Sequence, residues 1–176
     1  IITPPPEYLP TLRQLCDEFN ILLIFDEVIT GFGRTGSLFA ANTFGVTPDI
    51  LCCGKGMSSG YAPLAAAMVS DKVAQTFWGA PGTEFAHGHT YAGNPVAAAA
   101  GLASIREILE RRLPENARQV GAHLVRRLEG LRSFGIVGEI RGKGLMIGME
   151  LVKDPATKQP FPPETKIGVR IGKQAL

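Results

Sequence analysis

The chain has 176 residues, 45% of them hydrophobic and 19% charged, and a formal net charge of +2 at pH 7. This composition is typical of a globular protein, and the nearly balanced charge, with no basic stripe among aromatics, argues against a nucleic-acid partner. No apolar run approaches the roughly 20 residues that span a bilayer, and three cysteines without disulfide or metal-ligand spacing favour reduced thiols and a cytoplasmic location.

The first part of the chain alternates predicted helix and strand. A helix reaching about residue 20 is predicted from apolar side chains spaced i, i+3, i+4 and i+7, at Leu12, Leu15, Cys16 and Phe19. Residues 21–28 follow as a strand whose five consecutive apolar residues indicate burial on both faces, as in a central parallel strand. A second buried strand is predicted at 50–53 and a third at 63–69, where the alanines would also suit a helix.

The middle of the chain is predicted as a loop followed by helices. Residues 79–94 are rich in Gly, Pro, His and Thr, and Pro95 then begins an alanine-rich helix that reaches about residue 113. Pro114 restarts the helical periodicity, with one apolar face formed by Val120, Leu124, Leu128 and Leu131.

The last part of the chain has a different pattern. Strands at 136–141 and 145–152, joined by a Gly-Lys-Gly turn, precede a proline-rich connection and a helix from about residue 164. We therefore predict an α/β domain over residues 1–113 and the beginning of a smaller α+β domain over residues 114–176. Because the chain starts without methionine and stops inside that last helix, we expect an internal segment of a larger protein.

Residues 31–36 spell G-x-G-x-x-G directly after a predicted strand, which is the pattern of a dinucleotide-binding loop. That fold also requires a long helix after the glycines and an acid at the end of the next strand. Here the following segment is short and is interrupted by Gly45 and Pro48, and Asp49 precedes the second strand instead of ending it. Residues 31–36 are better interpreted as a turn in which the backbone passes close to another segment. A nicotinamide dehydrogenase is therefore the weaker hypothesis for the function.

Asp26 and Lys55 each follow a predicted parallel strand, so both should lie at the same edge of the sheet. Lys55 is either a solvated loop lysine or, if partly desolvated, an amine with a lowered pKa suited to Schiff-base chemistry. The upstream glycine of a phosphate-binding P-loop is absent. Asp26 could cap a turn or bind a metal, although Glu27 is the only acid beside it. Together the two residues suit an aldehyde cofactor, which the amine of Lys55 could bind and whose reactivity the carboxylate of Asp26 could adjust.

The loop before the long helix offers two further candidate groups. Thr90 and Tyr91 come just ahead of the helix start and could donate their hydroxyls to an anion. His87 and His89 form an H-x-H pair without a third ligand at useful spacing, which favours a structural loop over a zinc site.

Arg141 ends a predicted strand, and glycines leave space around it. A guanidinium in such a place could bind a carboxylate in bidentate fashion. A salt bridge with Glu139 or Glu150 is the simpler interpretation of the residue taken alone.

Four motifs, in this order and at this spacing, resemble the class III pyridoxal-phosphate (PLP) aminotransferases, the group that includes ω-amino acid:pyruvate transaminases. The motifs are L-I-F-D-E-V-I-T-G-F-G-R-T-G at 23–36, G-K-G at 54–56 with G-Y-A-P-L at 60–64, H-G-H-T-Y-A-G-N-P at 87–95 and R-G-K-G-L-M at 141–146. The resemblance covers nearly the whole chain. It implies a PLP-dependent transferase of fold type I, with part of the large, mostly parallel-sheet domain and the start of the small C-terminal domain.

The resemblance also implies a role for five residues. Lys55 would bind PLP covalently and act as general acid and base, and Asp26 would pair with the pyridine nitrogen of the cofactor. Val28 would pack on one face of the ring. Thr90 would donate to the cofactor phosphate of the neighbouring subunit, in a homodimer with shared active sites, and Arg141 would receive a substrate carboxylate.

The activity implied by the resemblance is the transfer of an amino group from an amino acid or amine to a keto acid such as pyruvate. An aminomutase, a decarboxylase or a racemase of the same fold would share Lys55 and Asp26, and a non-catalytic truncated binding module is a further alternative. Members of the family carry upstream a glycine/serine turn for the phosphate and a stacking aromatic, so residues 1–176 alone are expected to bind PLP poorly. No metal, nucleic-acid or membrane partner is expected.

Overall fold

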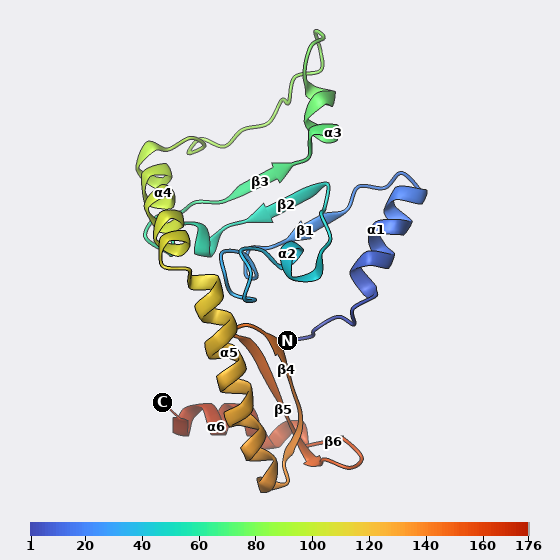
Figure 1. The fold of residues 1–176 in the computed structure, drawn as a ribbon, viewed down its shortest axis with the longest axis vertical. Coiled ribbons are helices and arrows are strands. Elements are labelled where there is room, and N and C mark those ends of the chain that lie inside the picture. Colours follow the sequence, from blue (N-terminus) through green and yellow to red (C-terminus); the bar gives the residue numbers. More distant parts are fainter. Residues whose placement is uncertain (176) are drawn as a thin grey trace.

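The structure is a computed structural model that describes residues 1–175, in which two small sheets are connected by two long helices. Helices α4 (Pro95–Glu110) and α5 (Leu113–Glu129) follow one another along one side of the molecule and lead from the first sheet to the second (Figure 1). Helix α1 (Tyr8–Glu18) lies on the opposite side of the first sheet from α4.

The first sheet has the strand order β1-β2-β3, with strands Ile24–Asp26, Ile50–Cys53 and Ala66–Val69. Strands β1 and β2 are parallel, and β2 and β3 are antiparallel. The second and third strands were predicted near these positions, and β1 is shorter than predicted. The parallel pair brings the carboxyl ends of β1 and β2 to one edge of the sheet.

The expected burial of the first strand on both faces is wrong for this chain. Leu23 is buried, but Ile21, Leu22 and Ile24 are exposed, Ile24 by 56%. An apolar run of this kind reflects the need for a covering layer on each face, and the residues that the structure describes supply only part of such layers.

Helix α1 is tied to the sheet by a charged pair. The guanidinium of Arg13 donates to Oδ2 of Asp49 at 2.8 Å, and the same carboxyl oxygen accepts the N–H of Leu23 at 2.8 Å. The Leu23 N–H, followed by Arg13, lowers the pKa of the Asp49 carboxyl below its ordinary value, because both stabilise the charged form. Asp49 therefore joins α1 to the start of β2 and is not a ribose-binding acid at a strand end.

Short elements fill the rest of the first half. They are the helices α2 (Ala40–Phe44) and α3 (Asp71–Ala74) and the 3₁₀ turns η1 (Lys55–Met57) and η2 (Gln75–Phe77). A long loop leaves η2 and passes across the end of the molecule to α4 (Figure 1). Asn94 caps α4 as its side chain accepts the N–H groups of Val96 and Ala97, each at 3.0 Å.

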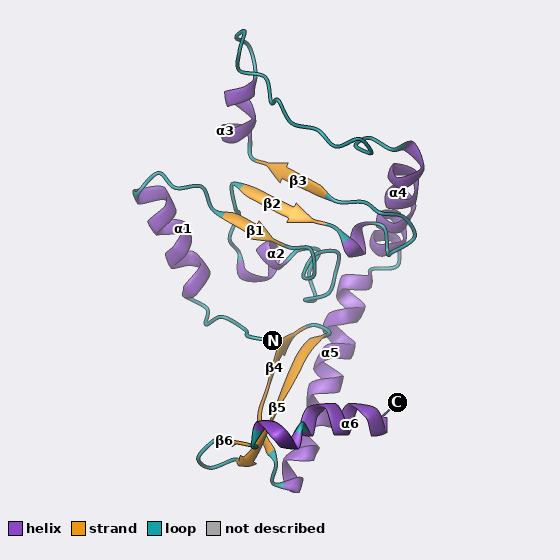
Figure 2. Ribbon diagram, turned by 180° about the vertical axis from the view of Figure 1, so that it is seen from behind, coloured by secondary structure: helices purple, strands orange, loops and turns teal. Residues whose placement is uncertain are grey.

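The second sheet is built on a long hairpin. Strands β4 (Val137–Lys143) and β5 (Met146–Asp154) pair antiparallel, and the short strand β6 (Gln159–Pro160), which was not predicted, pairs with β5. Helix α5 continues into η3 (Gly130–Phe134) and lies against the hairpin (Figure 2). The last helix is preceded by the 3₁₀ turn η4 (Pro163–Thr165) and is α6 (Ile167–Ala175).

The three cysteines are free thiols. Cys53 is buried, which raises the pKa of its thiol, whereas Cys16 and Cys52 are half-buried. Within residues 1–175, no helix combines the length and the apolar character needed to cross a membrane.

Candidate active site

The ends of β1 and β2 bring Asp26 and Lys55 to the same edge of the sheet. Asp26 is the last residue of β1 and pairs in register with Cys52 of the parallel strand β2. Lys55 follows the end of β2 by two residues and begins η1. The shared edge predicted from the sequence is therefore present in the structure.

Lys55 is held in an unusual backbone conformation. Its φ angle is +41°, in the left-handed region that costs a residue with a side chain about 1–2 kcal/mol. The following residue, Gly56, lies so close to Phe32 that a Cβ on Gly56 would stand 3.0 Å from the Phe32 Cβ. The Lys55 side chain is exposed, which agrees with the solvated alternative of the two considered from the sequence.

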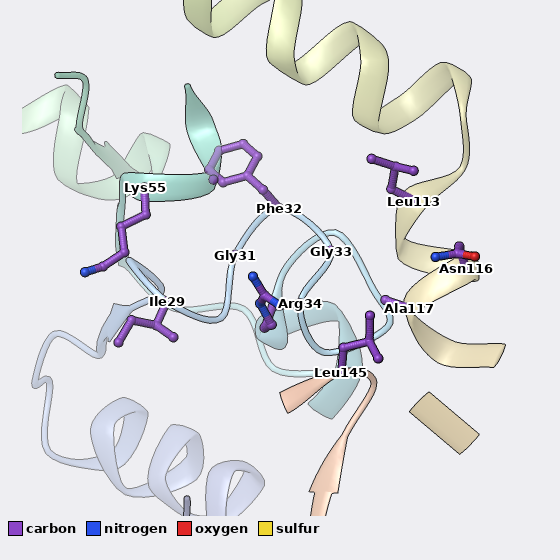
Figure 3. A pocket seen from close by; sticks show the side chains of 11 residues that line it. Ile29, Gly31, Phe32, Gly33, Arg34, Lys55, Leu113, Asn116, Ala117 and Leu145 are labelled. Carbon is purple, nitrogen blue, oxygen red and sulfur yellow. The ribbon is translucent and has the colours of Figure 1, made fainter. Parts of the chain in front are cut away.

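A cavity of about 350 Å³ lies beside Lys55 (Figure 3). Its walls are η1, the glycine-rich loop, the first turns of α5 and the turn between β4 and β5, with Ile29, Phe32, Arg34, Lys55, Leu113, Asn116, Ala117 and Leu145 among the lining residues. The other four residues that the resemblance singled out, Asp26, Val28, Thr90 and Arg141, are not part of this lining.

Asp26 is exposed at the strand end, and its Oδ1 atom accepts the N–H of Val28 at 3.0 Å. This local hydrogen bond turns the chain away from the strand and fixes the direction of the carboxylate. Val28 itself is half-buried. The strand end thus presents an acid whose carboxylate remains accessible.

Glu27, the neighbour of Asp26, has the opposite environment and was not predicted to matter. It is only 1% exposed. Its carboxylate accepts the N–H groups of Ala40 and Ala41, at 2.6 and 2.7 Å, and the hydroxyl of Thr30 at 2.9 Å. Glu27 therefore fixes the start of α2 and the first part of the loop that lines the cavity.

The glycine-rich loop is a tight turn and not the start of a dinucleotide-binding helix. The next helix, α2, begins at Ala40 and has five residues. Gly33 has φ +105° and lies against Pro114, and Gly36 has φ +93° and lies against Arg118, both in α5. The interpretation of a turn in close contact with another segment agrees with these contacts.

Thr90 lies in an exposed turn of the loop before α4. In the same loop the imidazoles of His87 and His89 are in edge contact, with 4.9 Å between ring centroids, and Phe85 is in edge contact with His87 at 5.7 Å. The H-x-H pair thus forms part of an aromatic row. Among residues 1–175, no group of three or more His, Cys, Asp or Glu side chains is arranged to hold a metal ion.

Arg141 lies on β4 and makes the salt bridges considered from the sequence. Its guanidinium is 3.4 Å from a carboxyl oxygen of Glu139 and 3.5 Å from one of Glu150. Its Nε atom also donates to the carbonyl oxygen of Ile1. A substrate carboxylate at Arg141 would have to compete with these partners.

Comparison with known proteins places the chain in one family. The aminotransferase class-III family matches residues 1–174. A probable aminotransferase of Mycobacterium tuberculosis is 47% identical over 161 residues, which cover 91% of this chain and 34% of that protein. The omega-amino acid–pyruvate aminotransferase of Pseudomonas putida is 44% identical over 149 residues, 82% of this chain and 33% of that protein.

Comparison with solved structures supports the same family assignment. An (S)-enantioselective omega-transaminase from Thermomicrobium roseum superposes with a TM-score of 0.89 at 48% identity, covering 96% of this chain and 37% of that one. A PLP-bound amine transaminase from an uncultivated Pseudomonas species gives 0.88 at 45%, covering 94% and 38%. The chain belongs to the class-III aminotransferases and has the corresponding part of the fold type I architecture. It spans about a third of the length of these relatives.

Proposed function

We propose that this protein is a PLP-dependent transaminase that moves an amino group from an amino acid or amine to a keto acid such as pyruvate. The observation that carries the proposal is the placement of Lys55 and Asp26 at one edge of a parallel strand pair in a chain of this family. The relatives named for omega-amino acid–pyruvate transfer and for amine transamination support the substrate classes.

The residues at this edge fit PLP. Lys55 offers an exposed primary amine next to a cavity, and Asp26 offers an accessible carboxylate at the neighbouring strand end. Lys55 would hold the aldehyde carbon, Asp26 would pair with the pyridine nitrogen, and Val28 would contact the ring. When bound, the cofactor supplies the electron sink that stabilises negative charge at the substrate carbon.

The chain's own residues would then carry out two tasks. The Nζ atom of Lys55 would take the proton from the substrate carbon that bears the nitrogen, as a general base. Asp26 would pair with the pyridine nitrogen of the cofactor and hold a proton there. Arg141 would exchange its partners Glu139 and Glu150 for a substrate carboxylate.

We further propose a homodimer in which Thr90 serves the cofactor phosphate of the neighbouring subunit. The support is the exposure of Thr90 and its absence from the cavity beside Lys55 of the same chain. Size-exclusion chromatography with light scattering tests the dimer. We also propose residues 1–113 as part of a large cofactor domain, residues 114–176 as the start of a small domain, and a cytoplasmic location, which the free thiols support.

The direct test is Lys55→Ala in the full chain that the gene encodes, assayed with several amino donors and pyruvate. Steady-state transamination should fall to background, and the absorbance of bound cofactor should change. Lys72→Ala, which removes another exposed lysine, should behave as wild type. Transamination retained by Lys55→Ala would contradict the proposal.

Product analysis separates the alternatives that share Lys55 and Asp26. Equimolar ketone or aldehyde and L-alanine from pyruvate identify a transaminase, whereas amino group migration, carbon dioxide or racemised substrate identify the aminomutase, decarboxylase or racemase. A non-catalytic binding module would be colourless after purification with added PLP.

A further inference from the structure

The cavity beside Lys55 is lined by two cationic side chains and by no acid. Its volume is about 350 Å³, and the charged residues of its lining are Arg34 and Lys55. No Asp or Glu from the part of the chain that the structure describes belongs to this lining. Asn116 adds an amide, and apolar side chains such as Phe32 and Leu145 complete the walls (Figure 3). A cavity of this size and charge suits a small molecule that carries an anionic group.

The backbone of Arg34 is held from two sides. Its carbonyl oxygen accepts the N–H of Leu145, in the turn between β4 and β5, at 3.0 Å. On either side of Arg34 in the glycine-rich loop, Gly33 and Gly36 both lie against residues of α5. The point from which the Arg34 side chain leaves the backbone is therefore fixed at the wall of the cavity.

The guanidinium of Arg34 has no charged partner within the described residues. The residue is exposed, and none of the salt bridges found there includes it. Glu115, an acid in the first turn of α5, is held instead by Arg118 and Gln119. Because a guanidinium offers paired donors that match a carboxylate, Arg34 can bind one without first breaking a salt bridge.

Arg141 differs from Arg34 in both respects. Its guanidinium already has two carboxylate partners, Glu139 and Glu150, and its Nε atom donates to the carbonyl oxygen of Ile1. It is also not part of the lining of the cavity. Of the two arginines, Arg34 is therefore the one that shares a cavity with Lys55.

Both a substrate carboxylate and the cofactor phosphate carry the negative charge that Arg34 suits. In the proposed arrangement the cofactor ring is held at Asp26 and Val28, and the phosphate is served by Thr90. None of these three residues lines the cavity. The cavity is thus left to the substrate, whose reacting carbon has to reach Lys55.

We propose that Arg34 is a substrate-binding residue that receives the carboxylate of the amino donor or keto acid inside this cavity. The inference rests on the proposed function and narrows its substrates to small molecules whose carboxylate fits beside Arg34 while their reacting carbon lies at Lys55. Arg34 acts in addition to Arg141, which has to exchange its partners first. An amine without a carboxylate does not use Arg34.

The test compares donors in the half-reaction alone. The PLP-loaded full chain is mixed with L-alanine, β-alanine or 1-phenylethylamine, without keto acid, and the absorbance of the bound cofactor is followed over a range of donor concentrations. Arg34→Gln should raise the half-saturating concentration of both alanines about tenfold, as expected for the loss of a charge-assisted hydrogen bond. The values for 1-phenylethylamine should stay within about twofold of the wild type, which also shows that the variant is folded.

A second measurement isolates the binding of the carboxylate. Propionate, which has a carboxylate but no amino group, is added as a competitive inhibitor of the half-reaction with 1-phenylethylamine. Its inhibition constant should rise about tenfold for Arg34→Gln. The rise should be smaller for Arg34→Lys, because lysine keeps the charge but not the paired donors. The affinity for PLP, measured by absorbance titration, should equal that of the wild type in both variants.

Arg127→Gln is the matched control. Arg127 is an exposed arginine in the last turn of α5 and is not part of the lining of the cavity. The variant removes the same charge as Arg34→Gln from another place on the surface. It should behave as the wild type with all three donors and with propionate.

The outcomes are distinguishable. Unchanged binding of the alanines and propionate in Arg34→Gln, an equal change for all donors, or the same change in Arg127→Gln would overturn the inference. So would weaker PLP binding in place of weaker donor binding, which would assign Arg34 to the phosphate, or a carboxylate preference that is lost in Arg141→Gln and kept in Arg34→Gln. Each of these results leaves the proposed function standing. A wild type that binds PLP and reacts with no donor would overturn the proposed function itself.

Discussion

The sheet edge that carries Asp26 and Lys55 is exposed to solvent, whereas the residues that support this edge are more buried. At the edge the two side chains are exposed, and Asp26 makes only a local hydrogen bond to Val28. The supporting carboxylate of Glu27 is buried and is held by backbone N–H groups, and Gly121 of α5 lies against the backbone of Gly144. Groups that must exchange partners during a reaction stay accessible, whereas the groups that fix their positions are removed from water.

The contrast is sharpest between two adjacent acids. Asp26 points to the open edge, and Glu27 is almost completely buried with three donors around its carboxylate. Because side chains alternate between the two faces of a strand, consecutive acids at a strand end enter different environments. One position can therefore serve chemistry while the next serves stability, and substitutions should separate the two roles.

The largest expected effect is on stability. Glu27→Ala leaves the N–H groups of Ala40 and Ala41 and the hydroxyl of Thr30 without their acceptor, and should lower the free energy of unfolding by about 3–5 kcal/mol. Urea denaturation measures this change. Glu18→Ala on the exposed side of α1 should change it by less than about 0.5 kcal/mol. A loss below about 1 kcal/mol for Glu27→Ala would refute the anchoring role.

Asp26→Asn should show the reverse pattern. Asparagine keeps an oxygen for the Val28 N–H and sits at an exposed position, so the free energy of unfolding should change by no more than about 0.5 kcal/mol. Loss of the charge should nevertheless reduce transaminase turnover by roughly 100-fold or more. Urea denaturation and steady-state kinetics on the same preparation measure the stability and the turnover. Normal turnover would show that Asp26 has no role in the proposed chemistry.

Asp49→Asn tests a half-buried contact that depends on pH. The pKa of the Asp49 carboxyl is lowered in the folded state by the Leu23 N–H and by Arg13, so its charge stabilises the fold above the unfolded pKa of about 3.9. We expect the variant to be about 1–2 kcal/mol less stable near neutral pH. The difference should shrink as pH falls below the unfolded pKa and through the lowered native one, which urea titrations at several pH values would show. A difference that does not depend on pH would contradict this account.

The smallest effect concerns the start of α4, which follows the turn that contains Thr90. Asn94→Ala removes the cap of α4 and should cost about 1 kcal/mol, whereas Asn94→Ser keeps a capping oxygen and should recover most of the loss. Thermal denaturation compares the two variants. Equal midpoints would mean that the cap contributes nothing measurable.

Much of this arrangement could be predicted from local sequence. The apolar runs and the acid and lysine that follow them indicated the strands and the shared edge, because parallel strands end on the same side of a sheet. The loop between Gly142 and Gly144 likewise indicated the hairpin. The salt bridges of Arg141 were predicted because their acids lie nearby on the paired strands.

What was missed depends on contacts between distant segments. Glu27 is anchored by N–H groups at the start of a five-residue helix, which is too short to show a periodic pattern. Gly121 and Gly144 bring together backbones that are far apart in the chain, and a glycine gives no sign in the sequence of what approaches it. The burial of β1 was overestimated because an apolar run indicates that a face needs covering, not which residues cover it.

The most direct test of the central claim is reductive trapping of the cofactor on the full chain. The protein is incubated with PLP, reduced with sodium borohydride, digested and analysed by peptide mass spectrometry. We predict that the reduced cofactor is found on the peptide that contains Lys55, and that Lys55→Ala loses this label while Lys72→Ala keeps it. A label on another lysine, or no specific label at all, would contradict the assignment of Lys55 as the amine that holds the cofactor.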